Sequence, residues 1–253
     1  MLKVLYEDDH IIVVWKPVGL ESQSSRGFGA DMVSEIKRHI HKLSPKAGEP
    51  YVGVIHRLDK PVSGVMVYAK EKKAAAALSR QVAEGKMQKK YLAVLCGKIV
   101  HNVDNFVDYL LKDEKNNLSK IVDKGITGSK RAELRVYPWE MIVDETYGPL
   151  TLAEVELMTG RHHQIRVQMS GHNLPLWGDN KYNPMFGGET EQEPGCSSNP
   201  AAPNSPRPRV RANVALAAWH LTFTHPVTGK KMTFEHLPDA LIFRRFQKIQ
   251  GMK

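Results

Sequence analysis

The 253-residue sequence predicts an α+β fold, and three observations carry this prediction. Stretches with the residue types and alternation of strands outnumber stretches with helical periodicity. The two kinds of segment do not alternate regularly along the chain, which argues against a doubly wound parallel sheet. The composition, 42% hydrophobic and 25% charged, is that of an ordinary soluble globular protein and excludes wholesale disorder. The length alone allows one large domain or two small ones.

Short strands are predicted wherever apolar and β-branched residues cluster between turn residues. They cover residues 2–6, 10–15, 51–55, 65–69, 91–95, 151–158, 214–224 and 231–234. A polar turn joins the first two strands, and Lys16-Pro17-Val18-Gly19 ends the second with a rigid proline and a permissive glycine. Residues 100–135 predict only short strands with polar loops.

Helices are predicted over residues 30–43, 71–84, 161–170 and 238–249. In the first, Met32, Ile36 and Ile40 recur at helical spacing. The second is rich in alanine and is followed by Gly85. The third is closed by Gly171, and the fourth begins at Pro238.

The segment 183–213 differs from the rest in composition. It holds six of the fifteen prolines, an acidic stretch, a basic stretch and few large apolar residues. We expect a mobile surface loop within one domain, because the strands on both sides belong to one sheet.

The chain is basic, with 36 Lys and Arg against 27 Asp and Glu and a formal net charge of +9. Part of the excess lies in residues 86–135, which hold eleven basic and six acidic residues. A polyanion such as RNA or DNA is one interpretation, and a solvated basic surface is an equally good one.

Several classes of protein are excluded or disfavoured. No apolar run is long enough for a transmembrane helix, and the N-terminus lacks the apolar core of a signal peptide, so we expect a cytoplasmic protein without membrane contact. The two cysteines, Cys96 and Cys196, form no metal-binding or disulfide pattern. The common nucleotide, zinc-protease and serine-hydrolase motifs are absent, and we expect no cofactor and no metal.

Two polar motifs remain. In the first, residues 53–64, Asp59 lies between Arg57 and Lys60 on a loop framed by apolar strands. Neighbouring cations would keep Asp59 ionised, as a nucleophile or base requires. Taken alone, the motif is more often an ion-paired aspartate that stabilises a loop.

The second motif, Thr159-Gly160-Arg161-His162-His163-Gln164-Ile165-Arg166, opens a predicted helix. A helix N-terminus with two arginines favours phosphate or carboxylate, and a solvated helix start with an ion pair is the alternative. The adjacent histidines would point about 100° apart on a helix and could not easily share a metal.

Together these motifs resemble those of the RluA-type pseudouridine synthases. The family signature matches His56-Arg57-Leu58-Asp59, with Ser63-Gly64 following, and a second signature matches residues 157–167. Further matches, in the same order along the chain, are Lys16-Pro17-Val18-Gly19, residues 89–93, residues 175–182 and His225-Pro226. This sequence departs from the family pattern at Val62, where a threonine is usual, and at residues 217–220.

The resemblance implies a single catalytic domain, residues 1–253, that contains the 183–213 loop. It implies a large mixed, mostly antiparallel β-sheet with flanking helices and a central active-site cleft. The implied activity is an isomerase that converts uridine in RNA to pseudouridine without cofactor or metal, by flipping the base out of its stack.

The resemblance also assigns roles to residues. Asp59 is the nucleophile or the base, Tyr91 faces the uracil, and Arg166 pairs with the aspartate. Arg57 enters the RNA stack in place of the flipped base. The other expected substrate-binding or cleft-framing residues are His56, Lys16, Arg161, His163 and Ile165.

Two alternatives stay open: an RNA-binding module without chemistry, and a small-molecule hydrolase or lyase that uses the same aspartate and arginine. The resemblance places the start of the catalytic domain at residue 2, so we expect recognition of structured RNA by the catalytic domain itself. Transfer RNA and ribosomal RNA are equally expected substrates, and we expect a monomer.

Overall fold

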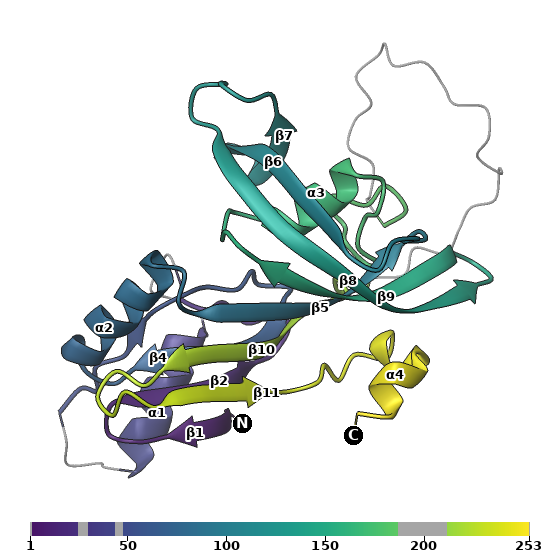
Figure 1. Cartoon of the computed structure of the whole chain (residues 1–253). Coiled ribbons are helices and arrows are strands. Elements are labelled where there is room, and N and C mark those ends of the chain that lie inside the picture. The colour runs from purple at the N-terminus through teal and green to yellow at the C-terminus, as the bar shows by residue number, and fades with distance from the viewer. Residues whose placement is uncertain (1, 25–29, 44–47, 187–211, 253) are drawn as a thin grey trace.

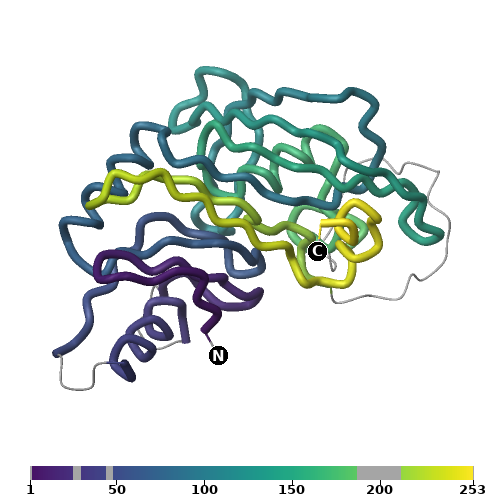
Figure 2. Tube along the Cα trace, turned by 60° about the horizontal axis from the view of Figure 1, so that its bottom comes forward, coloured from purple at the N-terminus to yellow at the C-terminus, as the bar shows by residue number. Residues whose placement is uncertain are grey.

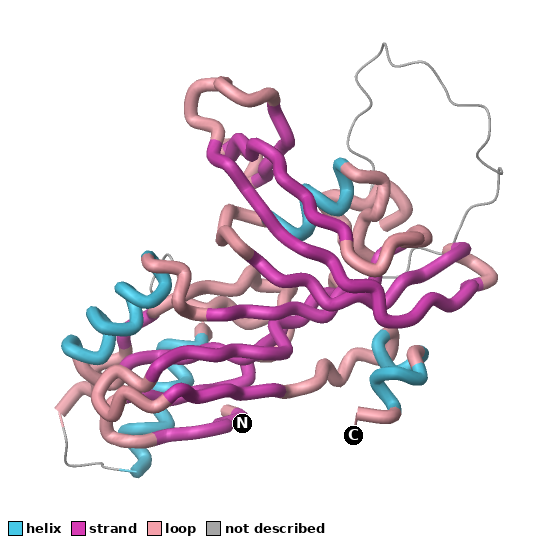
Figure 3. The backbone as a smooth tube through the Cα atoms, in the orientation of Figure 1, coloured by secondary structure: helices cyan, strands magenta, loops and turns pink. Residues whose placement is uncertain are grey.

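The computed structural model describes residues 2–24, 30–43, 48–186 and 212–252. Within these ranges the strands form one 11-stranded sheet, in which nine run in the order β1-β2-β4-β10-β5-β9-β8-β6-β7, with β11 beside β10 and β3 beside β4 (Figure 1). Among the described strands only β4 and β10 pair in parallel. Strands dominate the chain (Figure 3). The predicted α+β class and mixed, mostly antiparallel sheet are confirmed. Most of the predicted 183–213 loop, residues 187–211, lies outside the described residues.

We call one half of the sheet the N-terminal half, because it holds the first four strands of the chain. It consists of β1 (Lys3–Glu7), β2 (Ile11–Lys16), β3 (Gly53–Val54) and β4 (Ser63–Ala69), together with the late strands β10 (Leu216–Thr224) and β11 (Lys231–Glu235). The other half consists of β5 (Gln88–Cys96), β6 (Asp104–Asp113), β7 (Leu118–Val122), β8 (Lys130–Asp144) and β9 (Gly148–Leu157). The hairpin of β10 and β11 runs between the N-terminal strands and the other half (Figure 2), since β10 lies between β4 and β5.

The helices are α1 (Met32–Leu43), α2 (Lys72–Ala83), α3 (Gln164–Gly171), the 3₁₀ helix η1 (Phe243–Arg245) and α4 (Gln247–Gln250). Both faces of the central strands are covered, so β2 and β4 are buried at every position. One face packs against α1 and α3, through Met32, Ile36, Ile165 and Met169. On the other face, α2 covers the N-terminal half, and η1 and α4 cover β5 and β9. No helix among the described residues is long and apolar enough to cross a membrane.

Three predicted elements differ from the structure. The terminal helix predicted over 238–249 is the short η1 and α4, because Phe243, Phe246 and Ile249 recur every three residues and pack on the β5–β9 face. The predicted strand 51–55 shortens to β3. The helix predicted over 161–170 begins only at Gln164, for a reason given with the site below. Residues 100–135, hard to interpret from sequence, contain β6, β7 and the start of β8.

The single parallel pairing brings Gly64 against Ala218. A Cβ atom on Gly64 would lie 2.5 Å from the Ala218 Cβ and 2.7 Å from the Ala218 backbone N. The glycine thus allows β4 and β10 to approach closely, immediately after the loop that carries Asp59.

We expect Gly64→Ala to lower the free energy of unfolding by about 3 kcal/mol, because the added methyl group forces backbone apart in a packed core. Urea unfolding measures this change. The control is Gly48→Ala, where a Cβ meets nothing within 4 Å and the expected change is within about 0.5 kcal/mol. Equal stabilities of the two variants would contradict the prediction.

Candidate active site

Asp59 lies on the loop between β3 and β4, whose side chains alternate between interior and solvent. His56 and Leu58 are buried, whereas Arg57 and Lys60 are exposed. The Asp59 side chain is 32% exposed, so its carboxylate meets both solvent and protein. This alternation leaves the charged groups of the motif available at one surface while the apolar Leu58 anchors the loop.

The backbone on each side of Asp59 is held by side chains from the segment after β2. Ser22 Oγ accepts from the Leu58 N–H at 2.9 Å and donates to the Leu58 carbonyl at 2.9 Å. The carbonyl of Lys60 accepts from the Gly19 N–H at 2.9 Å and from Lys16 Nζ at 3.2 Å. The matched stretch 16–19 therefore supports the aspartate loop.

Lys16 frames the site from inside. Its side chain is fully buried, and Nζ also donates to the carbonyls of Pro17 and Leu20. Burial lowers the Lys16 pKa to about 8, although the charge of Asp59 opposes this shift. Of the two expected roles, phosphate contact or framing of the cleft, the burial favours framing.

Two side chains of the second motif approach the same oxygen of Asp59. Arg166 Nη1 and His163 Nε2 each lie 3.6 Å from Asp59 Oδ2. The structure therefore brings together the predicted pair Asp59 and Arg166, from segments more than 100 residues apart. It adds His163 to the same constellation.

The principal partner of Arg166 is a residue that the sequence analysis assigned no role. Arg166 Nε and Nη2 donate to the two oxygens of Asp179 at 2.7 and 2.6 Å, and both side chains are almost fully buried. Burial disfavours the charged guanidinium, but the hydrogen bonds and charge of Asp179 outweigh it and raise the Arg166 pKa. The sequence held one signal for this pair. A buried arginine needs a carboxylate partner, and Asp179 lies in the stretch 175–182 that matches the family pattern.

The turn from β9 into α3 explains why the helix begins late. His163 adopts a left-handed conformation, with φ of 53°, which no helix interior allows. The Gln164 side chain accepts from the Arg161 N–H at 2.9 Å and donates to the Glu133 carbonyl at 3.0 Å. The polar groups at this helix start are thus largely engaged within the protein. Arg161 itself is exposed, and its Nε donates to the Arg131 carbonyl.

An apolar wall borders the carboxylate. Tyr91 is 7% exposed and Ile165 is 4% exposed, and both belong to one hydrophobic cluster with Leu58 and Val62. Burial raises the Tyr91 pKa, and the charge of Asp59 raises it further, so the phenol stays protonated. Val62, which departs from the family pattern, is 2% exposed in this cluster, where a valine is well accommodated.

The remaining predicted residues are divided between surface and interior. Arg57 is exposed and borders a cavity of about 280 Å³ that is also lined by Gln23, Val54, Ile55 and His56. His56 is buried, its Nε2 accepts from the Val67 N–H at 3.3 Å, and burial lowers its pKa to about 3. His56 is therefore a neutral residue at the back of the loop. Among the described residues no group of three or more His, Cys, Asp or Glu could hold a metal ion.

The arrangement suits acid–base or nucleophilic chemistry by one carboxylate. Asp59 is partly solvated, and its carboxylate lies beside the buried guanidinium of Arg166. The neighbouring aromatic ring and the aliphatic side chains offer a flat apolar surface to a planar substrate group.

Comparison with known proteins finds relatives over most of the chain. A family model described as RNA pseudouridylate synthase matches residues 10–171. The ribosomal large subunit pseudouridine synthase D of Nitrosomonas europaea is 33% identical over 95% of this chain, which spans 63% of that protein. The synthase C of Escherichia coli K12 is 32% identical over 99% of this chain, which spans 70% of that protein. The solved structure of human RNA pseudouridylate synthase domain containing 4 shares the fold, with a TM-score of 0.72 at 20% identity, over 98% of this chain and 93% of that one.

The buried ion pair makes a direct prediction for stability. We expect Asp179→Asn to lower the free energy of unfolding by about 3 to 5 kcal/mol, because it leaves a buried guanidinium without its bidentate partner. Chemical denaturation measures the change. Asp123→Asn, at an exposed position, is the matched control and should leave the unfolding curve unchanged. A stability of Asp179→Asn equal to that of the control would show that the pair does not support the fold.

Proposed function

The chain belongs to the RNA pseudouridylate synthase family, and from this premise we propose that it isomerises specific uridines in structured RNA to pseudouridine. The single observation that carries the proposal is the position of Asp59 beside Arg166 and an apolar wall that includes Tyr91. The reaction breaks the bond between N1 of uracil and C1′ of ribose and forms a bond between C5 and C1′. It releases the proton on C5 and needs no electron donor or acceptor.

We assign Asp59 as the group that starts the reaction, either as a nucleophile towards the sugar or as a base. In both roles Arg166 would orient the carboxylate, because its guanidinium lies beside Asp59 and is itself held by Asp179. The bidentate contact also limits rotation of the guanidinium, so Arg166 approaches Asp59 from a constant direction.

Tyr91 and Ile165 would hold the detached uracil while it rotates. Their burial in one cluster offers the base an apolar surface and keeps water from the intermediate. The raised pKa of Tyr91 keeps its hydroxyl protonated, and a protonated phenol is a poor acceptor for the C5 proton, so the stacking role is better supported than proton removal.

The target base must leave the RNA stack to reach Asp59, and we propose that Arg57 occupies its place. Arg57 is the exposed neighbour of the half-buried aspartate, and its flat guanidinium suits stacking against bases. His56, behind the loop, would act through its shape and not through charge.

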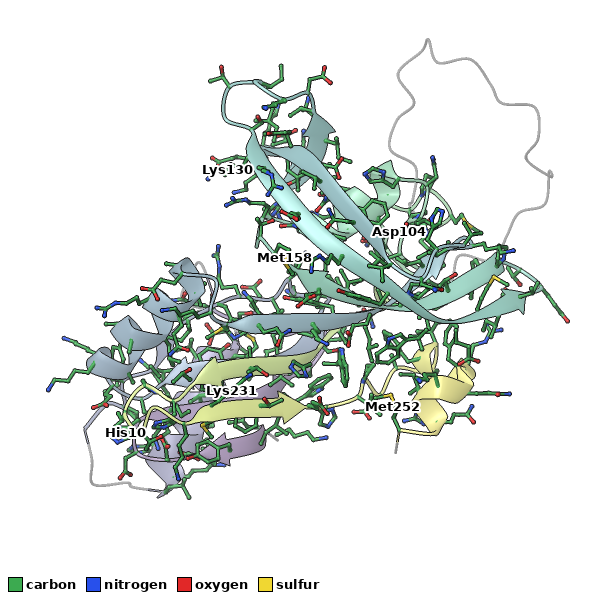
Figure 4. The ribbon with its side chains drawn as sticks, viewed as in Figure 1. His10, Asp104, Lys130, Met158, Lys231 and Met252 are labelled. Atoms are coloured by element: carbon green, nitrogen blue, oxygen red, sulfur yellow. The ribbon has the colours of Figure 1, made fainter. Side chains whose placement is uncertain are left out.

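RNA binding is supported by basic residues along the edge of the sheet that adjoins α3. Lys112, Lys115, Lys120 and Lys130 lie on or between β6, β7 and β8, and all four are exposed. Lys130 begins β8 beside the end of the β6–β7 hairpin (Figure 4). Helix α3 packs against β7, as the approach of Ile121 to Gly171 shows, so this edge continues into the candidate site.

Ribosomal RNA is the substrate class that the two bacterial relatives favour, because both are named as ribosomal large subunit pseudouridine synthases. Transfer RNA stays a prediction from the sequence alone. The monomeric state and the cytoplasmic location likewise stay predictions.

Asp59→Asn tests the chemistry and the RNA class together. In cells that lack the gene, we expect wild type to restore missing pseudouridines in ribosomal RNA and Asp59→Asn to restore none. With purified protein, release of tritium from C5-labelled uridine should fall at least about 1,000-fold. The control Asp9→Asn makes the same charge change at an exposed turn and should behave as wild type.

Persistent isomerisation by Asp59→Asn would overturn the assigned mechanism. RNA binding without any pseudouridine, even from wild type, would instead favour an RNA-binding module. If cells without the gene lack pseudouridines only in transfer RNA, transfer RNA is the substrate class in place of ribosomal RNA, and the proposed chemistry stands.

The salt dependence of RNA binding tests the basic edge. If Lys120 contacts a phosphate, Lys120→Gln should weaken binding and reduce the slope of log affinity against log salt by about 1. Lys248→Gln is the control, because Lys248 is exposed on α4, which packs on the opposite face of β5. Binding titrations at several salt concentrations measure the slopes. Equal slopes for the two variants would show that this edge of the sheet does not contact the RNA.

A further inference from the structure

His163 lies between Asp59 and Tyr182 and has no role in the chemistry above. Its Nε2 is 3.6 Å from Asp59 Oδ2, and its Nδ1 is 2.8 Å from the hydroxyl oxygen of Tyr182. The residue is 8% exposed, so few other partners can reach the ring. It also sits in the left-handed conformation that begins α3, which fixes its backbone.

The contacts of Tyr182 decide which ring nitrogen carries the hydrogen. The backbone N–H of Ser119 donates to the Tyr182 hydroxyl oxygen at 2.7 Å. The hydroxyl hydrogen is then free to donate, and His163 Nδ1, at 2.8 Å, is the acceptor that faces it. In a neutral imidazole the hydrogen is therefore on Nε2 and points towards Asp59. The opposite tautomer would set a lone pair of Nε2 against the carboxylate.

The surroundings of the His163 ring keep it neutral. Burial, together with the positive charge of Arg166, lowers the His163 pKa to about 3. The ring of His162 stacks on it at a centroid distance of 3.8 Å, and Lys181 and Lys112 add positive charge nearby. The negative group that faces it is Asp59, at a distance too long for a strong ion pair.

The two donors that approach Asp59 converge on one oxygen. Arg166 Nη1 and His163 Nε2 each make their shortest approach to Asp59 at Oδ2, at 3.6 Å. Hydrogen bonds at active sites are often long in the absence of substrate and shorten in the reacting complex. The two oxygens of a carboxylate are chemically equivalent, but here both donors approach Oδ2, so the surroundings of Oδ2 differ from those of Oδ1.

We propose that His163 is a positioning residue that donates from Nε2 to Asp59 Oδ2, so that Oδ1 is the oxygen presented to the uridine. Ser119 and Tyr182 set its tautomer from the β6–β7 hairpin and the segment after α3. The inference rests on the proposed function for its consequence in catalysis, but the tautomer is a property of the free protein.

A pair of substitutions separates positioning from a merely structural role. Asparagine is better tolerated than glutamine in the left-handed conformation, but only glutamine has an amide that can reach the position of Nε2. If His163 only shapes the turn, His163→Asn should retain activity and His163→Gln should lose stability. If it positions Asp59, His163→Asn should lower kcat about 10- to 100-fold with little change in KM, and His163→Gln should recover part of the loss. His172→Asn, at the exposed end of the same helix, is the control.

Nitrogen-15 NMR of histidine-labelled protein gives the activity-independent readout. The His163 signals, assigned by their absence from His163→Asn, should show a neutral ring with hydrogen on Nε2 at pH 5 to 8. In Tyr182→Phe the tautomer should become mixed. Hydrogen on Nδ1 in wild type, or wild-type kcat in His163→Asn, would overturn the proposal. An Nε2–H tautomer in a protein inactive on every RNA would leave the positioning geometry standing and overturn the proposed function instead.

Discussion

The buried ion pair between Arg166 and Asp179 is the interaction on which the site depends. An unpaired guanidinium could not remain in this interior, and a carboxylate that is fully buried needs a cation in return. The pair ties α3 to the segment that follows it, and the N–H groups of Lys181 and Tyr182 also donate to Asp179. One group of contacts thus fixes the charge near Asp59 and brings Tyr182 to His163.

The carboxylate that we propose to be reactive is held by a different part of the chain. Ser22, Gly19 and Lys16 hold the backbone before and after Asp59, and none of them needs to touch substrate. The close contact of Gly64 with β10 continues this support into the sheet. The aspartate and its arginine therefore come from opposite halves of one sheet, and β10, between β4 and β5, joins those halves.

Where the two halves of the sheet meet, apolar packing and electrostatics favour the same arrangement of the site. The same face of the sheet that packs on α1 and α3 carries the cluster of Tyr91 and Ile165, so the charged groups meet an apolar wall. Burial along this wall keeps the Tyr91 phenol and the His163 imidazole neutral. The guanidinium beside Asp59 is held in place by Asp179, so its position is set before any substrate binds.

The sequence by itself determined the fold class, most strands, and the short motifs that carry Asp59, Tyr91 and Arg166, because periodicity and motif spacing are local properties. It misplaced the start of α3 and the terminal helix, where a left-handed histidine and a three-residue apolar repeat override helical propensity. Only the tertiary structure decided that Arg166 binds Asp179, that Lys16 is buried, and which nitrogen of His163 faces the carboxylate. Each of these depends on which side chains the fold brings into contact and how deeply it buries them, and local periodicity encodes neither property.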